Sequence, residues 1–154
     1  MSPRDRSRRQ ATMAIAGHPI HPMLVPFPIA CFTLALLTDI AYWRTSNLMW
    51  LHFSEWLLLA GLVIGVFAAV AGAVDFLANS EIRAQRPAWP HAIGNAIALI
   101  LAFVNNLVHT ADGWTAVIPY GLILSALTVL ILLVTGWLGG SMVYRHAVGV
   151  RSHE

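Results

Sequence analysis

Four long apolar stretches make up most of the chain, and short polar segments separate them. They cover residues 23–43, 56–76, 91–111 and 119–143, and the only formally charged residues inside them are Asp39 and Asp75. An α-helix needs about 20 apolar residues to cross the hydrocarbon core of a bilayer, so each stretch is long enough. The runs lack the alternation of apolar and polar residues that a membrane β-barrel requires. The pattern therefore predicts an all-α fold, a four-helix transmembrane bundle.

The polar remainder of the chain is too short for a second domain. We expect one transmembrane domain, residues 17–150, between a disordered basic tail, residues 1–16, and a short tail, residues 151–154. Eight of the nine arginines lie in the N-terminal tail, between the second and third spans, or at the C-terminal end, whereas Arg44 follows the first span. Because cytoplasmic loops are enriched in arginine and lysine, we expect a multi-pass protein of the bacterial cytoplasmic membrane with both termini in the cytoplasm.

Composition agrees with a membrane protein and narrows the classes of function. The chain is 58% hydrophobic and 10% charged, whereas a soluble domain has roughly 25% charged residues. The single cysteine, Cys31, excludes a disulfide or zinc–thiolate framework. The few arginines are divided between segments, which argues against nucleic-acid binding and leaves the lipid bilayer as the expected partner. The sequence contains no phosphate-binding glycine loop and no recognisable nucleophile motif, so it does not decide whether the protein is an enzyme.

Small and polar residues recur at helical spacing along the second, third and fourth spans. In lipid, small residues allow helices to approach closely, and polar side chains turn toward one another. We therefore expect a bundle with a polar interior of small residues, whose small-residue faces also permit oligomerisation. The stripes consist of Gly61, Gly65, Ala69, Gly72 and Asp75 along the second helix, of His91, Asn95, Ala98, Ala102, Asn105 or Asn106, and His109 along the third, and of Gly121, Ser125, Thr128, Thr135, Gly139 and His146 along the fourth.

The segment from Gly17 to Pro28 reads GHPIHPMLVPFP and contains two histidines and four prolines. Proline fixes φ and biases the preceding residue toward extended geometry. In a polyproline-like conformation with three residues per turn, His18 and His21 would point the same way. Alternatively, Pro26 and Pro28 lie in the first turn of a helix, where a missing N–H costs little.

Histidines from several segments are expected to meet at the cytoplasmic end of the bundle. Neutral imidazole is the commonest metal ligand, and helix bundles build cofactor sites from side chains on facing helices. Two histidines on opposite sides of a porphyrin would bind haem b, with Gly139 and Ala98 leaving room, whereas three or four side chains would bind an iron, copper or zinc ion. The candidate ligands are His18, His21, His91 and His146, and Asp75 is either a further metal ligand or an acceptor that orients an imidazole.

The opposite end of the predicted bundle carries a second, smaller set of titratable residues. His52 and His109 lie there, with Glu55 one turn from His52 and Asp39 at a similar depth. The sequence leaves open whether they form a second site.

Motifs along nearly the whole chain resemble those of one family. These motifs are Gly17–Pro28, Gly72–Asp75, His91 with Asn95, and Gly136–Gly140 followed by Tyr144–His146. They are similar to those of the bacterial four-helix membrane family known as domain of unknown function 2231, and the resemblance covers about residues 14–150. It implies an integral membrane protein. Because some members of that family are joined to cytochrome c modules, it also suggests redox work.

Three hypotheses for the function follow from these features. The first is a small redox protein that binds haem b or a metal ion at the cytoplasmic histidines and exchanges electrons with a cytochrome or a quinone. The second is a structural or assembly subunit without a cofactor. The third is a proton or ion conductor in which Asp39, Asp75 and the histidines form a relay, since ionisable groups inside a membrane often mark such paths.

Overall fold

A computed structural model of the chain describes residues 11–111 and 117–146, except for the side chain of His146. Residues 1–10 and 151–154 of the two predicted tails therefore lie outside the described residues. The described elements are, in chain order, β1 (Ala14–Ile15), β2 (His18–Pro19), α2 (Ile20–Leu24), α3 (Pro26–Thr45), α4 (Leu48–Ala78), α5 (Ser80–Arg83), α6 (Ala88–Thr110), η2 (Val117–Gly121) and α7 (Leu122–His146).

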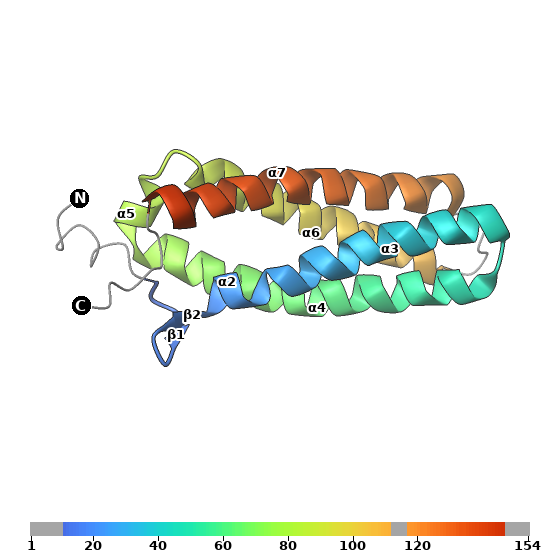
Figure 1. Cartoon of the computed structure of the whole chain (residues 1–154), viewed down its shortest axis with the longest axis horizontal. Helices are drawn as coiled ribbons and strands as arrows, with labels where there is room; N and C mark the ends of the chain where they lie inside the picture. The colour runs from blue at the N-terminus through green and yellow to red at the C-terminus, as the bar shows by residue number, and fades with distance from the viewer. Residues whose placement is uncertain (1–10, 112–116, 147–154) are drawn as a thin grey trace.

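Four long helices lie side by side along the long axis of the molecule (Figure 1). In the described part of the chain, four helical segments are long and apolar enough to cross a membrane, namely Ile20–Thr45, Leu48–Ala78, Ala88–Thr110 and Val117–Arg145. The predicted all-α, four-helix transmembrane bundle is therefore confirmed. One end of the bundle, which we call the hairpin end, carries β1, β2, α5 and the last turn of α7 (Figure 1). The opposite end carries the turn between α3 and α4.

Helix α4 begins at Leu48, well before the start of the second predicted span near residue 56. Its first turn is capped, because the side chain of Asn47 accepts a hydrogen bond from the backbone N–H of Met49 at 3.0 Å. One turn further on, Nδ1 of exposed His52 lies 3.0 Å from Oε2 of Glu55. Hydropathy alone missed these turns because a cap, and not the apolar run, sets the start of the helix.

The proline-rich segment is mostly helical, so the expected polyproline-like arm is wrong and the alternative interpretation is confirmed. Pro22 lies in the first turn of α2, and Pro26 is the first residue of α3. The first N–H groups of a helix have no partner within the helix, so proline costs little at these positions. The two histidines consequently differ in environment: His18 is exposed in β2, whereas His21 is half-buried in α2.

Small and polar side chains line much of the interior of the bundle, as the sequence stripes predicted, together with a few large apolar ones. Its apolar centre combines one aromatic ring and several aliphatic side chains, while large apolar side chains such as Trp137, which is 75% exposed, face outward. This distribution suits a lipid environment, where the exterior is apolar and polar groups turn inward. The centre consists of Phe32, Ala35, Leu58, Ala98, Ala102 and Leu132, and the buried polar residues are Asp39, Ser54, Asp75, Asn105, His109, Ser125, Thr128 and Thr135.

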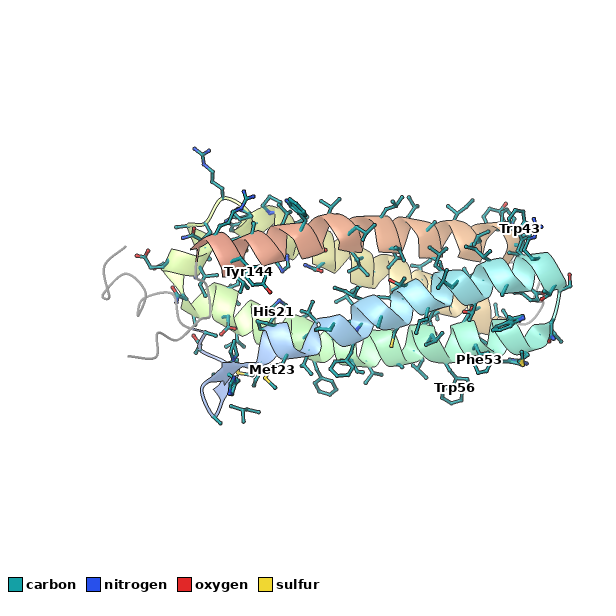
Figure 2. All side chains as sticks on the ribbon, viewed as in Figure 1. His21, Met23, Trp43, Phe53, Trp56 and Tyr144 are labelled. Atoms are coloured by element: carbon teal, nitrogen blue, oxygen red, sulfur yellow. The ribbon has the colours of Figure 1, made fainter. Side chains whose placement is uncertain are left out.

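Exposed aromatic side chains lie toward both ends of the bundle. Figure 2 shows Trp43, Phe53 and Trp56 toward the opposite end, whereas Tyr144 lies at the hairpin end. Tryptophan and tyrosine concentrate at the two interfaces between a membrane and water, because their rings are apolar and their tips are polar. The aromatic residues therefore fit a bundle whose long axis crosses the bilayer.

The two halves of the bundle repeat one pattern of burial. The buried residues of α3 are Pro28, Phe32, Ala35 and Asp39, and those 70 positions later in α6 are Ala98, Ala102, Asn105 and His109, which are also buried. The α4 and α7 helices match in the same way with a spacing of 67 positions, as for Ala68 and Thr135. Both helical hairpins start at the hairpin end, so the repeats run parallel and are related by an axis along the bundle (Figure 1).

Close packing of α3 on α4 depends on Gly61. A Cβ atom at this position would lie 2.6 Å from Cε1 of Phe32, so Gly61→Val forces the two helices apart. We expect a loss of about 1–3 kcal/mol of stability, measured as a lower melting temperature of the detergent-solubilised protein. Gly136→Val is the matched control, because a Cβ there meets nothing within 4 Å. Equal melting temperatures for the two variants would contradict this packing.

Candidate functional site

His21 is held against α4 by a hydrogen bond to the backbone. Its Nδ1 lies 2.8 Å from the carbonyl oxygen of Ala68. A carbonyl only accepts hydrogen bonds, so Nδ1 carries the proton and Nε2 of the neutral ring carries the lone pair. Gly72, one turn after Ala68, allows the ring to lie this close, because a Cβ there would be 2.8 Å from Nδ1.

His91 has the same arrangement in the second half of the bundle. Its Nδ1 lies 2.8 Å from the carbonyl oxygen of Thr135 in α7. Gly139 follows Thr135 by one turn, and a Cβ there would lie 2.8 Å from Cε1 of the His91 ring. The repeat therefore provides the same support twice, a carbonyl acceptor followed four residues later by a glycine. These carbonyl acceptors were missed by sequence reasoning, although the 67-residue spacing of the two glycines could have pointed to them.

The two imidazoles face one another near the axis that relates the repeats. Their ring centroids are 6.0 Å apart and their planes are perpendicular. Figure 2 shows His21 at the hairpin end, on the side of α2 that faces the other helices. The structure thus brings together two of the four histidines predicted to bind a cofactor, and residues from all four long helical segments position them.

Asn95 and Thr135 stabilise the surroundings of His91. Nδ2 of Asn95 donates to the backbone oxygen of His91 at 2.8 Å, and Oγ1 of Thr135 donates to Oδ1 of Asn95 at 3.3 Å. Nδ2 of Asn95 also lies 3.3 Å from both ring nitrogens of His91, so it does not lie along the lone pair of either one. Among the described residues, the hydrogen bond of the His21 side chain is the one at Nδ1, and it leaves Nε2 without a partner there.

The other predicted ligands do not join this pair in the part of the chain that the structure describes. Asp75 instead accepts hydrogen bonds from the backbone N–H groups of Thr12 and Met13, at 2.6 and 2.8 Å, and so fixes the chain before β1. His18 is exposed, and the side chain of His146 lies outside the described residues. Within residues 11–111 and 117–146, no group of three or more His, Cys, Asp or Glu side chains could hold a metal ion.

A second polar cluster lies fully buried toward the opposite end. Nε2 of His109 is 2.9 Å from Oδ1 of Asp39, and both side chains have no exposed surface. Oγ of Ser54 donates to Oδ1 of Asp39, and Oγ of Ser125 donates to Oδ2, each at 2.5 Å. The cluster therefore takes one residue from each long helix. Sequence reasoning placed Asp39 and His109 at a similar depth but did not pair them, although they occupy equivalent positions of the two repeats.

The hydrogen bonds of His109 fix the charge of this pair. Its Nδ1 donates to the backbone oxygen of Asn105 at 2.9 Å, so a single proton is shared between Nε2 and Asp39. An imidazolium beside a carboxylate and an imidazole beside a carboxylic acid have the same net charge of zero. A neutral pair costs far less to bury in hydrocarbon than a lone charge. The pair joins α3 of one repeat to α6 of the other, while His52 remains exposed and separate.

Substitutions of Asp39 should separate hydrogen bonding from charge. Asp39→Ala leaves His109, Ser54 and Ser125 without their buried partner, and we expect a loss of about 3–5 kcal/mol. Asp39→Asn offers an amide N–H to Nε2 of neutral His109 and a carbonyl oxygen to Ser125, so it should remain much closer to the wild-type stability. Thermal unfolding in detergent measures both. If Asp39→Asn unfolds as readily as Asp39→Ala, the shared-proton description is wrong.

Comparison with protein families gives one match. The family model described as "Predicted membrane protein (DUF2231)" matches residues 17–152, which include both histidines of the pair and the buried Asp39–His109 cluster. No curated protein and no solved structure matches the chain.

Proposed function

This chain belongs to the DUF2231 family of predicted membrane proteins, and we propose that it is a small redox protein in which His21 and His91 bind one transition-metal centre. The observation that carries the proposal is the pair of imidazoles itself. Each ring donates its Nδ1 proton to a backbone carbonyl of a neighbouring helix, at 2.8 Å. Metal-binding histidines are typically oriented in this way, with the second ring nitrogen left to bind the metal.

The separation of the rings fits two ligands of one metal atom. Two imidazoles that share a metal at distances of about 2.0–2.1 Å have ring centroids about 5–6.5 Å apart, depending on the angle at the metal. The observed separation is 6.0 Å. Perpendicular ring planes do not conflict with this role, because each ring rotates about its own bond to the metal.

The number of protein ligands favours some metal centres over others. Zinc generally takes three or four protein ligands, and the described residues offer two at this position. Two histidines suffice for the iron of haem b, whose porphyrin supplies the remaining donors, or for a copper ion of low coordination number. The space beside Gly72 and Gly139 is taken by the imidazoles themselves, so these glycines position the ligands and do not leave room for a porphyrin.

The proposed centre lies toward one face of the membrane. The arginine distribution supports the proposal that the hairpin end lies on the cytoplasmic side of the bacterial inner membrane. A metal centre there is suited to one-electron exchange with a cytochrome or with a quinone that reaches it from the lipid.

Ligand substitution tests the proposal directly. The full-length protein, produced with an adequate supply of haem, iron and copper, is purified in detergent and analysed by absorbance spectroscopy and elemental analysis. We expect about one centre per chain in the wild type and at least a tenfold lower content in His21→Ala and in His91→Ala. His52→Ala, at the exposed histidine of the opposite end, is the control and should retain the centre.

Absorbance spectroscopy and elemental analysis together distinguish haem b from a single metal ion. Soret, α and β bands in the reduced protein identify haem b, whereas stoichiometric copper or iron without these bands identifies a single ion. A wild-type protein that contains neither would overturn the redox proposal and favour the structural subunit. Proton or ion flux in liposomes that disappears on substitution of Asp39 or Asp75 would instead favour the conductor.

The glycine beside His91 allows a test that keeps both ligands. In Gly139→Ala the new Cβ would lie 2.8 Å from Cε1 of His91 and turn the ring away from its partner. We expect the metal content to fall several-fold with little loss of helical structure. Gly140→Ala is the matched control, because its Cβ would meet the nearest side chain, Tyr144, at 4.0 Å. Circular dichroism checks the helix content of both, and equal metal content in the two variants would argue against His91 as a ligand.

A further inference from the structure

An open groove lies on the surface of the hairpin end, between the segment that joins α5 to α6 and the last turns of α7. Its volume is about 590 Å³, and its lining includes Gln85, Arg86, Leu138, Ser141 and Arg145. The groove is separate from the paired histidines, which line the interior of the bundle. It combines two cationic side chains, two neutral polar ones and an apolar floor.

The two arginines of the groove are available to an anion. Arg86 and Arg145 are exposed and come from distant parts of the chain, and neither forms an ion pair within residues 11–111 and 117–146. Arg83, in the same connecting segment, differs because it donates to the backbone oxygens of Phe76 and Leu77. Arg86 and Arg145 thus bring two positive charges to one groove, and arginine binds phosphate oxygens in a bidentate manner.

The groove continues into an apolar depression deeper along α7. This depression has a volume of about 350 Å³ and is lined by Leu133, Val134, Trp137 and Leu138. Leu138 lines both parts, and the residues follow one another at helical spacing along one face of α7. From Leu133 to Arg145 the face extends for about 18 Å at 1.5 Å per residue. A basic end near the membrane surface is therefore joined to an apolar groove within the membrane.

We propose that this face of α7 binds an anionic phospholipid. The phosphate lies between Arg86 and Arg145, and one acyl chain lies along Trp137 and Leu138. Basic pockets between helices on the cytoplasmic side of membrane proteins recognise anionic headgroups, which fits the charge of this groove. The apolar depression favours a lipid over a free phosphate ion, because only a lipid has an acyl chain that can contact it.

Lipid titration of the full-length protein tests the proposal. The protein is purified in a neutral detergent, and its melting temperature is followed while phosphatidylglycerol, phosphatidylcholine or inorganic phosphate is added. We expect phosphatidylglycerol to raise the melting temperature and the other two to have little effect. In the double variant Arg86→Gln, Arg145→Gln, the concentration of phosphatidylglycerol that gives half the rise should increase at least tenfold.

Two controls separate this site from general attraction of a basic protein to anionic lipid. Arg44→Gln removes an exposed arginine at the opposite end and should leave the titration unchanged. Trp137→Ala keeps both arginines. It should weaken the binding of phosphatidylglycerol without creating a response to inorganic phosphate. An equal response of Arg44→Gln and the double variant would overturn the proposal, and so would a rise of the same size with inorganic phosphate. Neither result depends on the metal content of the protein.

Discussion

The hydrocarbon core of a bilayer provides no water to satisfy a polar group, and the interior of this bundle depends on that constraint. Each long helix contributes polar side chains to the inside, where they bond to one another or to backbone carbonyls. Asp39 is fully satisfied in this way, because both carboxylate oxygens are hydrogen-bonded and its side chain has no exposed surface. The shared proton with His109 keeps the pair neutral, so the polar cluster stabilises helix association and leaves no buried net charge.

The repeated helical hairpin explains why polar side chains meet in pairs. A residue near an axis that relates two parallel repeats lies close to its equivalent in the other repeat. Asp39 and His109 are equivalent by their spacing of 70 residues, and so are His21 and His91. One pair consists of an acid and a base joined by a hydrogen bond. The other consists of two imidazoles, which is the arrangement that suits a metal between the halves.

Glycine has the same role beside each of the two candidate ligands. Gly72 and Gly139 remove a side chain where an imidazole must lie against a backbone, and each follows the carbonyl that accepts the imidazole proton by four residues. The ring orientation is thus decided by the helix backbone rather than by a carboxylate. Asp75, expected either to bind a metal or to orient an imidazole, instead accepts hydrogen bonds from the backbone before β1. The tautomer of each histidine follows from backbone geometry alone.

The sequence by itself determined the features that depend on composition and on periodicity along one helix. The four spans follow from apolar length, and the inward face of α6 follows from the spacing of Ala98, Ala102, Asn105 and His109, since residues at that spacing share one side of a helix. Only the tertiary structure decided which side chains meet. Partner choice depends on which helices are neighbours and on the vertical register of each helix against them, and neither is encoded in the periodicity of a single helix. His21 and His91 face each other because their helices meet at that register. His18 lies in the extended segment β2, just before the chain becomes helical at Ile20, and it is exposed.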